Sequence, residues 1–243
     1  MPPVFSSFGL SHILVISASF CIIFLVLITQ KWHKQHQEIL SKIILWSGLI
    51  FFPVHFISYF FIIKSFDIRF DLPILQICGI TILSTCLYLI TKKPSLQTFF
   101  YNIVLFWGIS AMLASFFAPA LKEDFPHIYF WLFWLSHWTI VYVLSFVLIA
   151  KSKTVKYINL WQSVLTLVLY ALAIYPFNIV SNSNYAFLIS KPDIIHFGDY
   201  FNTNFDQSPT YILPALLVII VLFHLIYGVK LIISRFSVST VKI

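Results

Sequence analysis

The sequence predicts an all-α integral membrane protein, a bundle of seven transmembrane helices with the N-terminus outside the cell and the C-terminus in the cytoplasm. Three observations predict this fold class. Hydrophobic residues make up 60% of the 243 residues and charged residues only 9%, whereas soluble domains contain about 25% charged residues. The chain contains seven long apolar runs. Its basic residues gather in alternate connections between those runs.

Each apolar run is about as long as the roughly 20 residues that a helix needs to cross the hydrocarbon core of a bilayer. In chain order, the expected spans are residues 10–29, 43–63, 72–91, 99–118, 125–150, 158–180 and 211–233. The runs lack the period-two alternation of the roughly ten-residue strands in outer-membrane barrels, so we expect helices, whose backbone groups bond internally. We expect the spans to pack as one domain, residues 1–243.

The first run and the longest connection define the outer side of this bundle. The first run follows MPPVFSSFGLS, which contains no Lys or Arg, and no small-x-small cleavage site comes after it. This pattern differs from that of a signal peptide, so we expect the run to be retained as a span. The connection of residues 181–209 is too long for a simple connector, and we expect it to cap the outer end of the bundle.

Lys and Arg are distributed unevenly between the two sides. Eleven of the fifteen lie in the first, third and fifth connections or at the C-terminal end, namely Lys31, Lys34, Lys42, Lys92, Lys93, Lys151, Lys153, Lys156, Lys230, Arg235 and Lys242. The other four are Lys64, Arg69, Lys122 and Lys191. By the positive-inside rule the first group is cytoplasmic. The basic residues therefore indicate a multi-pass protein of the cell membrane beside anionic lipid, and no nucleic-acid partner is expected.

The polar residues inside the spans are the candidates for function. No span contains Asp, Glu, Lys or Arg away from its ends, which argues against proton pumps and retinal proteins. At 1.5 Å rise per residue, Cys78 lies ~10 Å, His55 ~12 Å and His137 ~18 Å from the outer ends of their spans, and His127 lies at the rim. These residues come from three spans but share one leaflet, so a common cavity beneath the long connection is geometrically allowed.

A cysteine beside a histidine is the minimal pair of a nucleophile and a general base. Imidazole accepts the thiol proton, and the thiolate attacks an ester carbonyl to form a thioester, which requires no metal or cofactor. The side-chain amide of Gln76 is a candidate donor to the developing oxyanion. We expect Cys21 and Cys86 to pack as small hydrophobic residues and His224 to bond to a neighbouring helix.

Four stretches carry a resemblance to a known family. LPILQIC, FWGISAMLASFFAP, FPHIYFWLFWLSHWTIV and NYAFLISKP occur in this order, and the chain between residues 72 and 231 resembles the YwaF-type family of bacterial integral membrane proteins. That family is similar to the eukaryotic transmembrane protein 164 acyltransferases, implicated in moving acyl chains between phospholipids through a cysteine. It is more distantly similar to the androgen-induced membrane hydrolases of lipid esters. The resemblance implies a seven-span helical fold and acyl chemistry.

The resemblance also implies roles for individual residues. The family's cysteine falls on Cys78, and the histidine of its fifth-span motif falls on His137. Five further positions match, namely His127, Asn184, Tyr185, Lys191 and Pro192. At Gln76 this chain departs from the histidine that we expect in many members.

Together these observations predict a membrane-embedded lipid acyltransferase or transacylase, or a lipid ester hydrolase, acting on a membrane phospholipid. Cys78 is the expected nucleophile and His137 the expected base. The expected supporting residues are His55, Gln76 and His127, and the expected substrate-binding residues are Asn184, Tyr185 and Lys191. Two alternatives remain, a transporter of small molecules or lipids that uses the same cavity, and a membrane accessory subunit without catalytic activity. The absence of inverted repeats in the sequence argues against the transporter.

Overall fold

The computed structural model describes residues 4–58, 75–117, 119, 121–189 and 212–239, without the side chains of residues 51, 52, 54–58 and 235–239. This described part of the chain folds almost entirely into helices. They are α1 (Leu10–Ile28), α2 (Gln30–Gln35), α3 (Gln37–Ser58), α4 (Ile77–Ile90), α5 (Pro94–Ile103), the π-helix η4 (Val104–Gly108), α6 (Ile109–Phe117), α7 (Ile128–Ile149), α8 (Tyr157–Ser181), the 3₁₀ turn η5 (Tyr185–Phe187) and α9 (Ile212–Ser239).

Five of the predicted spans coincide with helices that are long and apolar enough to cross a membrane. They are α1, the continuous helix Pro94–Phe117 formed by α5, η4 and α6, then α7, α8 and the Ile212–Ser234 part of α9. The prediction of an all-helical, multi-pass membrane protein is therefore confirmed.

The two remaining predicted spans overlap α3 and α4. Residues 59–63 of the first lie outside the described residues, as do residues 72–74 of the second. The apolar helix α4 has 14 residues, a length of about 21 Å at 1.5 Å per residue, against about 30 Å of hydrocarbon. The count of seven spans stays a prediction.

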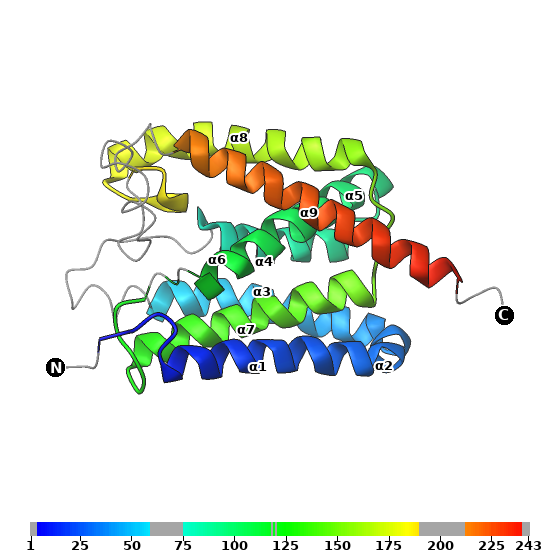
Figure 1. Cartoon of the computed structure of the whole chain (residues 1–243), viewed down its shortest axis with the longest axis horizontal. Coiled ribbons are helices and arrows are strands. Elements are labelled where there is room, and N and C mark those ends of the chain that lie inside the picture. The colour runs from blue at the N-terminus through cyan, green and yellow to red at the C-terminus, as the bar shows by residue number, and fades with distance from the viewer. Residues whose placement is uncertain (1–3, 59–74, 118, 120, 190–211, 240–243) are drawn as a thin grey trace.

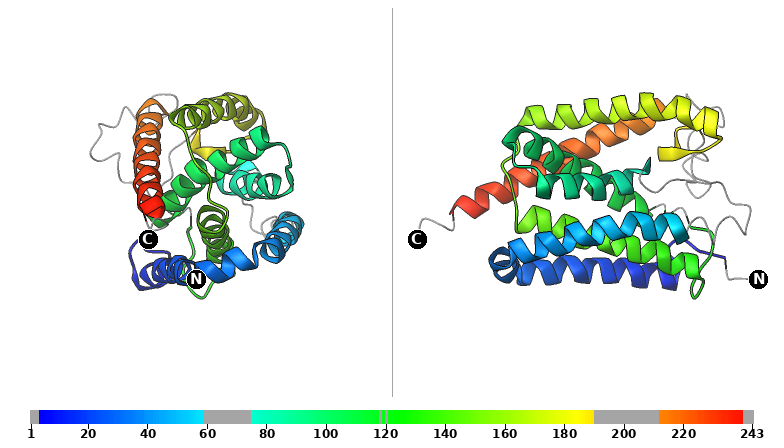
Figure 2. Two further views of the ribbon diagram at one scale, coloured as in Figure 1. Left: turned by 90° about the vertical axis from the view of Figure 1, so that its right-hand side faces the viewer. Right: turned by 180° about the vertical axis from the view of Figure 1, so that it is seen from behind.

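The helices run roughly parallel to the long axis of the molecule, and the start of α1 and the end of α9 lie at opposite ends (Figure 1). Seen along that axis, α7 lies among α1, α3 and the α4–α6 region, with α8 and α9 on the far side (Figure 2). α7 packs against α1, α4, α6 and η4, and α4 also packs against α3 and α5. α4 and α7, the two helices that carry the predicted Cys/His pair, are therefore direct neighbours.

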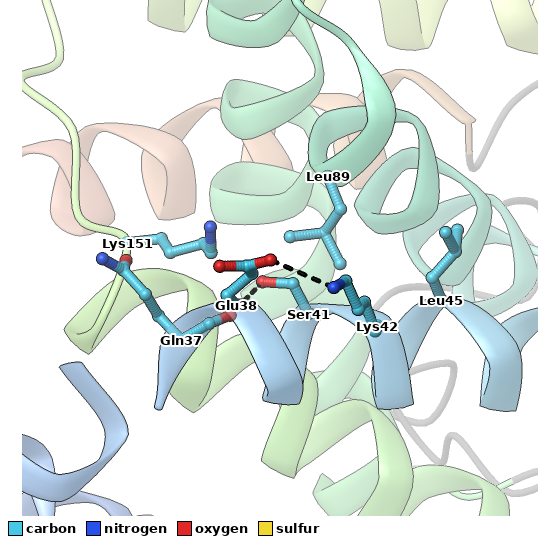
Figure 3. Close-up of a pocket in the computed structure, with 7 residues that line it drawn as sticks. All are labelled: Gln37, Glu38, Ser41, Lys42, Leu45, Leu89 and Lys151. Carbon is cyan, nitrogen blue, oxygen red and sulfur yellow. Dashed lines mark hydrogen bonds and ion pairs between the residues drawn. The ribbon is translucent and has the colours of Figure 1, made fainter. Parts of the chain in front are cut away.

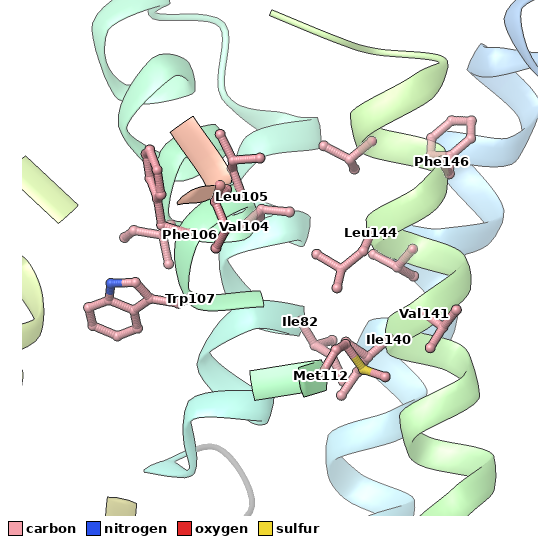
Figure 4. Close-up of a cluster of buried hydrophobic side chains, with 14 of the residues drawn as sticks. Ile82, Val104, Leu105, Phe106, Trp107, Met112, Ile140, Val141, Leu144 and Phe146 are labelled. Carbon is pink, nitrogen blue, oxygen red and sulfur yellow. The ribbon is translucent and has the colours of Figure 1, made fainter. Parts of the chain in front are cut away.

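The buried core includes residues of α4, η4 and α7. Figure 4 shows Val104, Phe106 and Trp107 of η4 with Ile140 and Leu144 of α7, which belong to one cluster of buried residues, although Phe106 and Trp107 turn away from α7. All five are buried. All five residues of η4 are buried, because η4 is in contact with α4, α7, α8 and α9.

The outer surface of the bundle is apolar over much of its length. On α9, Leu213, Leu217, Val218, Val221 and Leu225 are each at least 60% exposed. Soluble monomers rarely expose a continuous apolar face of this size. Lipid chains would cover it, which agrees with a membrane protein.

Candidate active site at the Cys78–His137 pair

Cys78 lies in the first turn of α4, closer to the helix start than the sequence indicated. Gln76 is the N-cap residue, with extended backbone angles of φ −72° and ψ 149°, so the helix begins at Ile77. Leu75, the residue before Gln76, is bonded to α8, because the Tyr170 hydroxyl donates to the Leu75 carbonyl at 2.6 Å. The helix therefore begins five residues after the expected start of the span at residue 72, while the depth of ~10 Å in the membrane stays a prediction. The thiol belongs to a helix N-terminus, where backbone N–H groups lack helical partners.

His137 reaches the thiol from the middle of α7. Its Nε2 lies 3.6 Å from the Cys78 Sγ, although the two residues are 59 positions apart in the chain. The imidazole is buried at 8% exposure and stacks on the Phe133 ring with centroids 4.1 Å apart. Packing therefore holds the ring in one orientation toward α4.

The hydrogen bond on the far side of the ring sets the tautomer. His137 Nδ1 lies 2.7 Å from the Phe133 carbonyl oxygen, which can only accept, so Nδ1 carries the proton in the neutral ring. Nε2 is then the lone-pair nitrogen and faces Sγ. The Ser136 hydroxyl, 3.3 Å from Nδ1, donates to the same Phe133 carbonyl. The arrangement is that of a general base beside a thiol.

The predicted supporting residues lie at different distances from this pair. Gln76 is half-buried two positions before Cys78, and its side chain forms no capping hydrogen bond. His127 is the N-cap of α7 and accepts from the Tyr129 N–H at 3.4 Å. It precedes His137 by ten positions, about 15 Å along the helix axis, so the structure does not bring these two imidazoles together. His55 belongs to α3, but its side chain lies outside the described residues.

The start of the predicted outer loop is folded onto α8. Tyr185 is 1% exposed, its N–H donates to the Asn178 Oδ1 at 2.9 Å, and its carbonyl accepts from the Asn178 Nδ2 at 3.1 Å. The Asn184 Oδ1 accepts from the Ile189 N–H at 3.0 Å. Tyr185 packs in a small cluster whose edge includes Leu75. The loop start therefore borders the segment that leads to Cys78, while Lys191 lies outside the described residues.

Sequence reasoning missed two buried polar residues near this region. Asn178 is the first, and its signal is an amide in an apolar span followed by a loop. His12 is the second; it is fully buried, as is Trp134, and the two ring centroids lie 5.4 Å apart. The His12 Nδ1 accepts from the Phe8 N–H at 2.8 Å. The His12 Nε2 and the Trp134 Nε1 form no hydrogen bond within the described part of the chain. Trp134 lies one turn before His137.

Two further observations complete the polar inventory. His224 bonds through Nε2 to the Tyr157 hydroxyl of α8 at 3.1 Å, which confirms the prediction that it serves contact between helices. The described residues contain no group of three or more His, Cys, Asp or Glu side chains arranged to hold a metal ion.

Comparison with known proteins relates the chain to one family. The TMEM164 family matches residues 7–227, a range that includes both Cys78 and His137. No curated protein and no solved structure matches the chain.

Proposed function

The chain belongs to the TMEM164 family, and from this premise we propose that it is a membrane-embedded lipid acyltransferase or transacylase that uses Cys78 and His137. The observation that carries the proposal is the 3.6 Å contact between Sγ and Nε2. The opposite nitrogen of the imidazole is held by a carbonyl, so the basic nitrogen faces the thiol. The family match supports a membrane setting, and the geometry supports a nucleophile and a base.

In the first half-reaction, the Cys78 sulfur attacks the ester carbonyl of a phospholipid while His137 Nε2 takes the thiol proton. The tetrahedral intermediate collapses with cleavage of the ester C–O bond, and the imidazolium gives its proton to the departing glycerol oxygen. The products are a lysophospholipid and a thioester on Cys78. The Gln76 amide is our candidate donor to the oxyanion, because its side chain makes no capping bond.

In the second half-reaction, the hydroxyl of an acceptor lysophospholipid attacks the thioester carbonyl. His137 removes the hydroxyl proton, the C–S bond breaks, and the imidazolium returns the proton to the sulfur. Water in place of the lipid hydroxyl would make the same site a lipid ester hydrolase. Both outcomes use the same two residues, so the acceptor decides between transfer and hydrolysis.

The proposal includes a membrane topology. We place seven spans in the cell membrane with the N-terminus outside, so that the Cys78–His137 pair lies in the outer half. The start of α1 and the end of α9 lie at opposite ends of the bundle (Figure 1), which agrees with an odd number of crossings. The connections rich in Lys lie at the end where α9 finishes, which agrees with the positive-inside rule.

The test is intact-protein mass spectrometry after incubation of the purified chain with phospholipid in detergent. We expect an added acyl mass in the wild type that disappears in Cys78→Ala and falls by about 10²- to 10⁴-fold in rate in His137→Gln, the usual contribution of a general base. Cys21→Ala is the matched control, because Cys21 is an exposed thiol on α1 and should leave the adduct unchanged. An adduct that persists in Cys78→Ala would refute the assignment. No adduct with any lipid, in a folded protein, would favour a transporter or an accessory subunit.

A further inference from the structure

A cavity lies at the end of the bundle opposite to the start of α4. Its volume is about 380 Å³, within the range of small-molecule sites. Figure 3 shows the lining residues, which come from the start of α3, the end of α4 and the connection after α7. They are Gln37, Glu38, Ser41, Lys42, Leu45, Leu89 and Lys151. Leu89 follows Cys78 on α4 by eleven positions, about 16 Å of helix, so this cavity is separate from the candidate active site.

Two ammonium groups line the polar side of the cavity. Lys42 is paired with Glu38 at 3.0 Å, but both side chains are more than 65% exposed, and an exposed pair of this kind contributes little and exchanges easily. Lys151 is half-buried and forms no ion pair with the described residues. Its backbone is held in place because the Tyr88 hydroxyl donates to the Lys151 carbonyl at 3.0 Å. The Lys151 ammonium therefore lines the cavity without an ion pair to the described residues, while Glu38, the acidic residue of the lining, is paired with Lys42.

The other side of the cavity is apolar and adjoins the surface that lipid would cover. Leu45 and Leu89 line this side. On the adjacent face of α3, Ile39, Ile43 and Trp46 are 59%, 54% and 63% exposed. A ligand that fits both sides carries an anionic group for the lysines and a hydrocarbon chain for the exposed face. A glycerophospholipid has this combination, with the phosphate at headgroup depth and the acyl chains beside α3.

We propose that this cavity binds the phosphate of a membrane phospholipid between Lys42 and Lys151, with the acyl chains along the exposed face of α3. Ammonium groups donate charge-assisted hydrogen bonds to phosphate oxygens, and the Gln37 amide is a further donor. Glu38 disfavours a second negative charge near Lys42, so a phosphodiester with one charge fits better than a phosphomonoester with two. The site lies at the basic end of the bundle, in the leaflet opposite to the one proposed for Cys78.

The experiment measures lipid binding to the full chain in detergent by native mass spectrometry, with dioleoyl phosphatidylglycerol as the probe. Dioleoylglycerol and inorganic phosphate are the two comparison ligands, since each has one half of the recognised chemistry. The variant is Lys42→Gln with Lys151→Gln. Its matched control is Lys31→Gln with Lys34→Gln, which removes the same charge from exposed positions on α2 at the same end. Charge-assisted bonds to the phosphate lead us to expect about tenfold weaker binding in the first pair and less than about twofold in the control.

Equal weakening in both pairs would overturn the proposal, because it would indicate attraction to the basic end as a whole. Free phosphate that binds as tightly as the lipid would overturn the assignment to a lipid. Ser41→Trp is a second variant that fills the cavity and retains both lysines, and we expect the same loss of lipid. If Ser41→Trp binds the lipid like wild type, the cavity is not the site. Thioester formation on Cys78 is a separate readout, so failure of one proposal leaves the other standing.

Discussion

Gly108 sets the distance between the two helices that carry Cys78 and His137, and its substitution by alanine is the most direct test of this packing. A Cβ at this position would lie 2.5 Å from the Leu144 Cδ2 and 2.9 Å from the Thr81 Cγ2, whereas carbon atoms in contact are normally about 3.5–4.0 Å apart. Thr81 is on α4 and Leu144 is on α7. The added methyl group would therefore act as a wedge between them.

The magnitude follows from the room available on each side. Leu144 is 5% and Thr81 1% exposed, so neither side chain can move outward without disturbing its neighbours. Overpacking of this kind costs about 1–3 kcal/mol, and the higher helix propensity of alanine returns up to about 1 kcal/mol. We expect a net loss of about 1–2 kcal/mol, or a fall in the thermal midpoint of about 2–8 °C for a chain of this size.

The assay is thermal unfolding of the purified protein in detergent, followed by tryptophan fluorescence. Gly228→Ala is the matched control, because a Cβ at that position would have no heavy atom within 4 Å, and the substitution should leave the midpoint unchanged or raise it. Leu144→Ala in the Gly108→Ala background removes the closest atoms and should recover part of the loss. If Gly108→Ala is as stable as Gly228→Ala, the close approach of α4 and α7 is wrong.

The same substitution reaches the candidate site. Thr81 lies three positions after Cys78, and Leu144 lies seven positions after His137, so separation of the helices lengthens the contact between Sγ and Nε2. A displacement of about 1 Å can lower a rate by about 10²-fold. We therefore expect the rate of thioester formation in Gly108→Ala to fall more than its stability.

Three further predictions concern other contacts. Asn178→Leu removes both hydrogen bonds between Asn178 and the Tyr185 backbone, while the Tyr185 carbonyl keeps the Leu188 N–H; we expect a loss of about 1–3 kcal/mol, so an unchanged thermal midpoint would contradict the role of Asn178. Gly48→Ala places a Cβ 2.5 Å from the Cys86 Sγ; it should destabilise the protein by about 1–3 kcal/mol, and the double variant with Cys86→Ala should be more stable than the single one. Burial lowers the pKa of Lys151, so its charged form opposes folding at neutral pH. Lys151→Gln in lipid-free detergent should therefore raise the midpoint at neutral pH, and this gain should vanish as the pH approaches 10.5, the unfolded-state value.

The candidate site shows where sequence reasoning stops. Counting residues from the span ends placed Cys78 and His137 in the same leaflet, and the resemblance to a family implied their roles. The sequence could not show which way each side chain points around its helix axis, because α7 is apolar on all sides and has no polar face that defines an orientation. His127 and His137 lie on one helix whose rise separates them by about 15 Å, as the sequence placed them, and the supporting role of His127 stays a prediction.

By itself the sequence determined the all-helical membrane class and the approximate positions of five helices that are long and apolar enough to cross a bilayer. These properties depend on hydropathy summed along a continuous segment, and a local sum does not require knowledge of neighbours in space. Only the tertiary structure decided that α4 begins at Ile77, that Sγ meets Nε2 at 3.6 Å, and that Asn178 holds Tyr185. These features depend on where a helix is capped and on contacts between different segments of the chain. Such contacts depend on how close-packed helices are rotated against one another.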